Sequence, residues 1–190
     1  MGDVAELPTL ALSLIQPWAW AVIHGPKDIE NRTWWSIIRG PVWIAASAQV
    51  TRRYYDQARE LMKGIAGIDC PKLDELEYGK IIGSANIVDC ILPGGYTSAK
   101  EIDCRSACTA YKLHGARWGS DRATPLRFHP RDRHPWHFVE QYGYVLADRV
   151  PVAKPVPCKG HQRWWRVPTS VLEQLNGFEK ENTNGSNSQG

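Results

Sequence analysis

The sequence predicts an α+β fold, in which a small mixed β-barrel carries flanking helices and one irregular basic insertion. Three observations support this prediction. Several short apolar runs have the length of strands, only two or three segments have helical spacing, and residues 96–140 lack clean periodicity. At 190 residues the chain is long enough for one well-buried domain, whereas two domains would each be small.

The strands are predicted from apolar runs that glycine or proline interrupts. From Ile29 a period of two places Glu30 and Arg32 on one face of an extended segment and Asn31 on the other. A long strand over 80–91 contains Gly83, which permits a bend or a bulge. Further strands are predicted over 9–15, 42–46, 142–150 and 164–167, with an extended segment over 152–157.

Two helices and a terminal one are expected. Gln16-Pro17 opens a short helix over 18–23, because proline at the first position lacks only an N–H that would be unpaired anyway, and Gly25 ends it. A terminal helix begins near Ser170, which forms a weak capping box with Glu173. The helix over 51–65 is expected to bury the face formed by Tyr54, Ala58, Leu61 or Met62, and Ile65.

One domain is expected over residues 9–175, between an N-terminal extension of residues 1–8 and a tail of residues 176–190. The tail is polar and carries little to bury, so we expect it to be disordered. Residues 1–8 do not resemble a signal peptide, and no run of about 18 apolar residues predicts a membrane span. Five cysteines at irregular spacing fit a reducing environment, so a cytoplasmic location is expected.

The charge is modest overall but locally basic. The formal net charge is only +3, which does not by itself indicate a nucleic-acid-binding protein. Residues 109–138 contain six lysines and arginines against two aspartates, and a second basic and aromatic cluster covers 159–166. Basic residues interleaved with aromatic ones are typical of surfaces that bind a phosphate backbone with stackable bases. A solvated basic face is the alternative for residues 109–138.

The cysteines and histidines of the insertion suggest a zinc site only weakly, because their spacing matches none of the familiar zinc patterns. Surface histidines with unrelated thiols are the better interpretation, and no metal site is assigned. The residues concerned are Cys104, Cys108 and His114, with His129, His134 or His137 as the fourth ligand. Most of the tryptophans considered are expected in the core, namely Trp20, Trp34, Trp35, Trp43 and Trp165. For Trp18 and Trp164 both a place in the core and a role in base stacking are kept as alternatives.

The segment Gly25-Pro-Lys27-Asp-Ile-Glu30-Asn-Arg32 is the first candidate for a functional site. It places Lys27, Glu30 and Arg32 between a short aromatic helix and a tryptophan pair, and charges crowded in this way are costly unless they pair with one another or with a ligand. A solvated ion-pair network at a strand edge is the alternative.

This segment matches the Gly-x-Lys-x-x-Glu-x-Arg signature and resembles the ASCH domain, the activating signal cointegrator 1 homology domain, within the PUA-like superfamily. Four further stretches resemble the family in the same order along the chain. They are 12–19, Arg39–Ser47, Gly79–Gly83, and Pro157–Gly160 followed by Trp165. The resemblance covers roughly residues 9–95 and 140–175, and it has no counterpart for the insertion at about 96–140.

The resemblance implies a PUA-like β-barrel with a cleft that handles RNA or nucleotides. In that cleft Lys27 would hold a phosphate or stabilise developing negative charge, Glu30 would act as an acid/base partner, and Arg32 would grip phosphate or a base edge. Other lining candidates are Gln16 for hydrogen bonds to a base, Trp18 for stacking, and Ser47, Lys159 and Gly160 on neighbouring segments.

Three functional hypotheses remain open, and RNA or single-stranded nucleic acid binding is favoured. The second is a hydrolase, either a ribonuclease assisted by Mn²⁺ or Mg²⁺ or an amidohydrolase of acetylated cytidine. The amidohydrolase branch of the family carries a threonine nucleophile where this chain has Glu30. A carboxylate would instead act as general base on a water, or only neutralise Lys27 and Arg32. The third is a protein–protein adaptor that uses the insertion.

Overall fold

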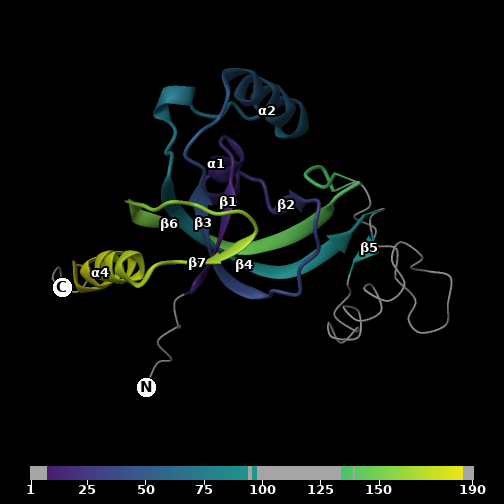
Figure 1. Cartoon of the computed structure of the whole chain (residues 1–190). Coiled ribbons are helices and arrows are strands. Elements are labelled where there is room, and N and C mark those ends of the chain that lie inside the picture. The colour runs from purple at the N-terminus through teal and green to yellow at the C-terminus, as the bar shows by residue number, and fades with distance from the viewer. Residues whose placement is uncertain (1–7, 94–95, 98–133, 139, 186–190) are drawn as a thin grey trace, which may run out of the picture. The chain divides into compact units, whose positions relative to one another are not determined.

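The structure is a computed structural model that describes residues 8–93, 96–97, 134–138 and 140–185. The predicted insertion and its cysteines therefore lie almost entirely outside the described residues. Figure 1 labels the elements along the chain. They are β1 (Leu10–Leu14), α1 (Trp18–Ile23), β2 (Ile29–Arg32), β3 (Gly40–Ala46), α2 (Arg52–Ala66), the 3-10 turn η1 (Leu73–Glu75), β4 (Lys80–Leu92), β5 (Tyr96–Thr97), β6 (Tyr142–Pro157), β7 (Trp164–Arg166) and α4 (Thr169–Gly185).

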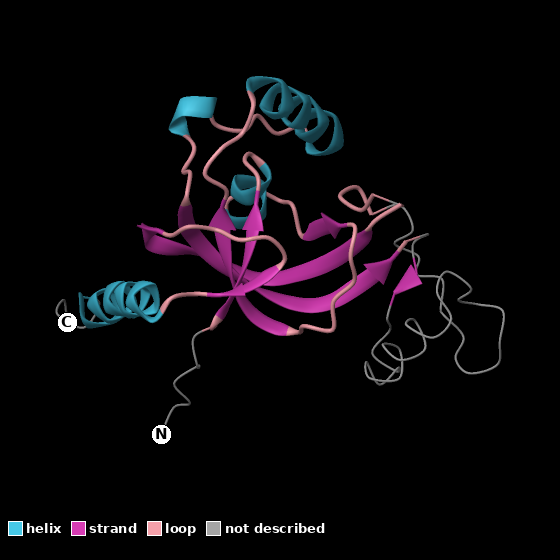
Figure 2. Cartoon of the chain, in the orientation of Figure 1, coloured by secondary structure: helices cyan, strands magenta, loops and turns pink. Residues whose placement is uncertain are grey.

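The strands form one mixed sheet, which confirms the predicted α+β class (Figure 2). Their hydrogen-bonded order is β2-β6-β4-β3-β1-β7, and β5 pairs with β4. β1 lies parallel to β3, with Leu12 opposite Ile44, and antiparallel to β7, with Ala11 opposite Trp165. β2 pairs antiparallel with the start of β6, where Glu30 lies opposite Tyr144.

The chain divides into two compact units. The first comprises residues 1–27, 41–86 and 148–190, and the second comprises residues 28–40 and 87–147. All of the described helices belong to the first unit, whereas the described part of the second consists of strands and loops. The long strands β4 and β6 contribute residues to both units.

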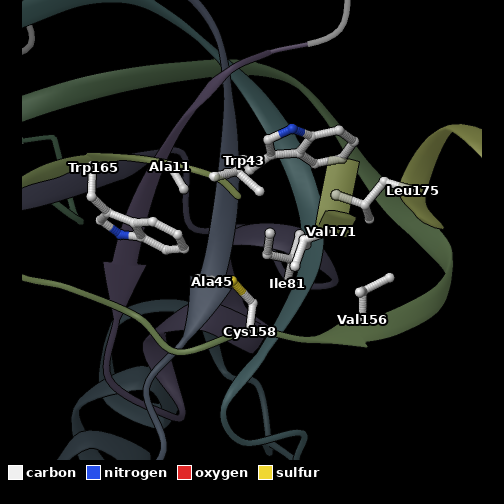
Figure 3. Close-up of a cluster of buried hydrophobic side chains, with 10 residues drawn as sticks. Ala11, Trp43, Ala45, Ile81, Val156, Cys158, Trp165, Val171 and Leu175 are labelled. Atoms are coloured by element: carbon white, nitrogen blue, oxygen red, sulfur yellow. The ribbon is translucent and has the colours of Figure 1, made fainter. Parts of the chain in front are cut away.

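The core of the first unit gathers side chains from five strands and from α4 (Figure 3). Trp43 is 1% exposed, and its indole Nε1 donates to the carbonyl oxygen of Pro8 at 2.7 Å, so its polar atom is satisfied. Val171 and Leu175 anchor α4 to this cluster. Among the tryptophans expected in the core, Trp43 and Trp165 are buried.

α2 forms where its sequence predicts a helix, but with a slightly different buried face. Thr51 caps the helix by accepting from the backbone N–H of Tyr54, and Gly67 ends it with a left-handed φ of 66°. The buried side chains are Tyr55, Ala58 and Met62. Tyr54 is 39% exposed, which corrects the expectation that it lies in the core. A buried face that begins at Tyr55 rather than Tyr54 also satisfies helical spacing. The Tyr55 hydroxyl then donates to the carbonyl oxygen of Pro71 at 2.7 Å.

β6 is a single strand where the sequence predicts two segments separated by Pro151. Proline removes a backbone donor and therefore favours strand edges. β2 pairs only with Tyr142–Val145 of β6, so the prolines lie on a later part of the strand that β2 does not cover. At the C-terminus, α4 begins at Thr169, one residue before the predicted cap, and continues beyond Phe178 to Gly185.

Gly83 is explained by close packing rather than by a bend alone. A Cβ atom at this position would lie 2.6 Å from the carbonyl oxygen of Val150 and 2.7 Å from Cδ1 of Ile23. Only glycine therefore allows β4, β6 and α1 to approach one another this closely in the first unit.

Candidate functional site

Gln16 fixes the beginning of α1. Its side-chain oxygen accepts from the backbone N–H of Trp20 at 3.0 Å, and its amide nitrogen donates to the carbonyl oxygen of Glu77 at 2.8 Å. The residue is 1% exposed. The oxygen and the nitrogen of the side-chain amide each form a hydrogen bond with a backbone group, so Gln16 positions the helix that carries Trp18. Its predicted contact with a base would use the second N–H or the second lone pair of this amide.

The turn after α1 is held by two residues. Gly25 lies against the helix, since a Cβ atom there would be 2.9 Å from the carbonyl oxygen of Ala21. Arg149, on β6, donates from Nη1 to the carbonyl oxygens of Val22, Gly25 and Lys27 at 3.1, 2.9 and 3.0 Å. These contacts satisfy one carbonyl in the last turn of α1, that of Val22, and fix the backbone after the helix that presents Lys27.

Lys27 is 3% exposed, and its ammonium Nζ lies 5.6 Å from the centroid of the Trp18 ring. The ring is partly exposed, and its Nε1 donates to the hydroxyl of Tyr54 at 3.1 Å. A desolvated cation near a tryptophan face is attracted by the ring quadrupole. The indole is therefore fixed both by the cation and by a hydrogen bond at its edge, and Tyr54 is a site residue that the sequence did not indicate.

In the second unit, Glu30 and Arg32 form an ion pair. Nη2 of Arg32 lies 3.0 Å from Oε1 of Glu30, and the side chains are 19% and 9% exposed. This pair confirms that the two residues share one face of β2, as the period of two predicted. The pairing places a buried carboxylate and a largely buried guanidinium side by side, which removes part of the cost of burying each charge.

The hydroxyl of Tyr144, which faces Glu30 across the sheet register, donates to the carbonyl oxygen of Trp34 at 2.8 Å. Burial raises the pKa of Tyr144 far above its ordinary value, with the charge of Glu30 acting in the same direction. The phenol therefore stays protonated, and it adds a neutral donor beside the charged pair.

Asn31, on the opposite face of β2, binds the segment 134–138 through both ends of its amide. Nδ2 donates to the carbonyl oxygen of Trp136 at 2.7 Å, and Oδ1 accepts from the N–H of Phe138 at 2.9 Å. Nε2 of His134 lies 3.2 Å from Oδ1 of Asp28. The end of the insertion that the structure describes is thus anchored on the strand that carries Glu30 and Arg32.

The remaining candidates lie around β1 in the first unit. The backbone N–H of Ser47 donates to the carbonyl oxygen of Leu14 at 2.8 Å. A Cβ atom at Gly160 would lie 2.6 Å from Oγ of Ser13, which also accepts from Nε1 of Trp165 at 3.0 Å. Gly160 therefore allows the loop between β6 and β7, residues 158–163, to pack closely against β1. Lys159, in the same loop, is exposed.

The structure assigns the candidates to two groups. Gln16, Trp18 and Lys27 belong to the first unit, together with Ser47, Lys159 and Gly160. Glu30 and Arg32 belong to the second. Arg149 and Tyr54 were missed because each acts through a contact that is distant in sequence, and nothing in the local pattern marks either. Within the described residues, no group of three or more His, Cys, Asp or Glu side chains is arranged to hold a metal ion.

The fold and these residues define a mixed α+β domain in which Trp18, Lys27 and Tyr54 form a cluster of a cation and aromatic rings. The family model of the ASCH domain matches residues 12–148, and the chain therefore belongs to the ASCH domain family. This confirms the resemblance to the ASCH domain that the sequence indicates. No helix in the described part of the chain is long and apolar enough to cross a membrane.

Human activating signal cointegrator 1 is 30% identical over 81 residues, which cover 42% of this chain and 14% of the cointegrator. The mouse protein is 28% identical over the same proportions. The chain thus matches a small part of these relatives. An ASCH crystal structure from Zymomonas mobilis is similar with a TM-score of 0.41 and 14% identity, covering 88% of this chain and 93% of that one. A mutant of the Zymomonas protein gives a TM-score of 0.41 at 16% identity, covering 90% and 98%.

Proposed function

We propose that the protein binds RNA or single-stranded nucleic acid and holds one nucleotide against Trp18. The observation that carries the proposal is the fixed, partly exposed indole of Trp18, with the Lys27 ammonium 5.6 Å from its centroid and the Tyr54 hydroxyl at its edge. Proteins that recognise unpaired bases stack them on aromatic rings that are held in place. Membership of the ASCH family supports the same class of ligand.

Residues 159–166, in the loop before β7 and in β7 itself, supply a basic surface in the same unit. Lys159, His161, Arg163 and Arg166 are exposed, and no acidic residue interrupts 159–166. Arg163 has a φ of 58°, an uncommon conformation for a residue other than glycine. Exposed lysine and arginine side chains contact phosphates without reading sequence, so we expect the affinity for nucleic acid to fall steeply as the salt concentration rises.

In the second unit, Arg32 is proposed to contact a phosphate or a base edge. Its guanidinium is the group whose planar fork matches a phosphate, and the side chain is 19% exposed beside Glu30. Glu30 holds the guanidinium in orientation. In the alternative hypothesis of a hydrolase, the same carboxylate acts as the acid/base group on RNA or on a modified nucleoside, with Mn²⁺ or Mg²⁺ as cofactor of a ribonuclease.

The test is a gel of labelled single-stranded RNA with purified protein, with and without Mn²⁺ or Mg²⁺, read for both shift and cleavage. Trp18→Ala should weaken the shift about tenfold, because stacking on an aromatic ring contributes about 1–3 kcal/mol per base. Trp18→Phe keeps an aromatic face and should retain most of the affinity. Equal binding by the wild type, Trp18→Ala and a Lys27→Ala/Arg32→Ala double variant would contradict the proposal.

Cleavage in the same gel would favour the hydrolase hypothesis. Glu30→Gln should then abolish cleavage and leave the shift, because the amide keeps the shape of the side chain and removes its acid/base function. A salt-sensitive shift without cleavage at any metal concentration would establish a binding module. The Glu30→Gln variant in that case should bind RNA with at most a small change in affinity.

A further inference from the structure

A hollow of about 690 Å³ lies beside α2 in the first unit, and Trp18, Lys27 and Tyr54 are not among its lining residues. We call it the α2 hollow. Three segments line it: the loop after β3, one face of α2, and the residues around η1. The lining residues are Ala48, Gln49, Val50, Arg52, Tyr55, Arg59, Lys72, Leu73, Asp74 and Tyr78.

Most of the charged side chains that line the α2 hollow are cations. Arg52 and Arg59 are seven positions apart, two helical turns, and they lie on the same face of α2. Lys72 adds a third cation from the segment before η1, against the single acidic lining residue Asp74. Cations that converge from two segments on one hollow are the arrangement that binds a phosphate group.

The ion pairs of these cations do not compete strongly with a ligand. Arg52 pairs with Asp56, Arg59 with Asp69 and Lys72 with Glu75, and none of these acids is among the lining residues of the hollow. The two arginine side chains are 73% and 46% exposed, respectively. Exposed ion pairs contribute about 0–1 kcal/mol to stability. A phosphate can therefore replace the acids as the partner of these cations at little cost in free energy.

The walls of the α2 hollow are fixed before any ligand arrives. The hydroxyl of Tyr55 donates to the carbonyl oxygen of Pro71 at 2.7 Å, and that of Tyr78 donates to the carbonyl oxygen of Leu73 at 2.8 Å. Burial raises the pKa of Tyr55 to about 12, so this phenol stays neutral and adds no negative charge. Ala48, Val50 and Leu73 contribute apolar surface.

We propose that the α2 hollow binds a nucleotide phosphate, with the arginines and Lys72 on the phosphate and the tyrosine and aliphatic side chains against the remainder of the ligand. Its volume falls within the range of about 300–1,000 Å³ that is typical of small-molecule sites, and it is too large for a phosphate ion alone. The site does not depend on Trp18 or Lys27. The nucleotide is either free or part of a strand, since both present the same phosphate chemistry.

The experiment is a titration of the full chain followed by the backbone amide NMR signals of Ala48, Gln49 and Leu73, which report on the α2 hollow alone. The probes are AMP, adenosine without phosphate, and a short single-stranded RNA. We expect saturable shifts with AMP or with the RNA, and none with adenosine at the same concentrations. Shifts with AMP indicate a site for free nucleotides, whereas shifts with RNA alone indicate a site for a strand.

An Arg52→Ala/Arg59→Ala double variant should weaken this binding at least tenfold, because it removes two charge-assisted contacts. Arg53→Ala is the matched control, since Arg53 is an exposed cation of the same helical turn that does not line the hollow, and it should change the affinity less than twofold. Lys72→Ala, at a side chain 81% exposed, provides a second variant that does not touch α2. It should weaken binding several-fold.

Three results would overturn the proposal: no shift at these amides with any phosphate ligand, equal shifts with adenosine, or equal losses in Arg53→Ala and the double variant. Trp18→Ala separates this proposal from the proposed function. The α2 hollow should respond to AMP in that variant as in the wild type. If RNA binding survives Trp18→Ala while the double variant abolishes it, the Trp18 site is wrong and the α2 hollow stands.

Discussion

The guanidinium nitrogen Nη1 of Arg149 lies 2.9 Å from the carbonyl oxygen of Gly25, although 124 positions separate the two residues in the sequence. The same nitrogen also contacts the carbonyl oxygens of Val22 and Lys27. One side chain of β6 thus closes the end of α1 and fixes the backbone of the residue that lies against Trp18. A cation at this position also suits the negative end of the helix.

Arg149→Ala should lower the free energy of unfolding by about 2 kcal/mol, because the carbonyl groups of Val22, Gly25 and Lys27 would lose their charged hydrogen-bond donor. Arg149→Lys should recover only part of this, since an ammonium is a compact point charge on a flexible stem and reaches fewer carbonyls. Urea unfolding followed by tryptophan fluorescence measures both. A loss no larger than that of Arg53→Ala, at an exposed position of α2, would show that the contacts of Arg149 contribute little.

The sequence predicted the order of strands and helices well, because each follows from a local pattern. The face of β2 is an example: a period of two placed Glu30 with Arg32, and the two side chains form an ion pair. The contacts between distant segments were not predictable in this way. The sequence predicts Arg149 only as part of a strand. Nothing near it in the sequence reveals that its guanidinium bonds three carbonyl oxygens more than 120 positions away.

Two positions show why the side chains of a site are harder to predict than its elements. Tyr54 and Tyr55 fit the amphipathic pattern of α2 almost equally, and packing decides that Tyr55 is buried while Tyr54 reaches Trp18. Gln16 is polar and next to the site, so it was predicted to bind a base. Its amide also forms hydrogen bonds with two backbone groups, which periodicity does not reveal.

The stability of the protein should fall as the pH is lowered below the ordinary pKa of histidine because of His137. Burial lowers the pKa of this imidazole in the folded state, while Nε2 lies 2.9 Å from the carbonyl oxygen of Gln141. The unfolded state then binds more protons, so stability is fully present above about pH 6.5 and declines as the pH falls toward the lowered folded pKa. Urea unfolding at a series of pH values from 7.5 to 5 measures the slope.

His137→Gln supplies the control for this pH dependence, because an amide can donate to Gln141 but does not titrate in this range. The variant should show a smaller decline between the same two pH values. An unchanged slope would assign the effect to other groups.

Cys90 should resist thiol reagents in the folded protein. Burial raises the pKa of its thiol to about 12, and the side chain is fully enclosed, so the reactive thiolate is scarce and inaccessible at pH 8. Alkylation with iodoacetamide, followed by mass spectrometry of peptides, should label Cys90 at least about a hundredfold faster in urea than in buffer. Rapid labelling in buffer would indicate that this part of β4 opens readily.

Two glycine-to-alanine substitutions in the first unit should have opposite effects. Gly25→Ala places a Cβ atom 2.9 Å from the carbonyl oxygen of Ala21, a backbone atom that cannot move without disturbing α1, and should destabilise the protein by about 1–3 kcal/mol. Gly64→Ala, inside α2 and with no atom from outside its own stretch of helix within 4 Å of the added Cβ, should stabilise the protein by about 0.5–1 kcal/mol through helix propensity. Paired urea unfolding measures the difference in sign. RNA affinity should fall in Gly25→Ala and not in Gly64→Ala, because only the first disturbs the turn that presents Lys27 to Trp18.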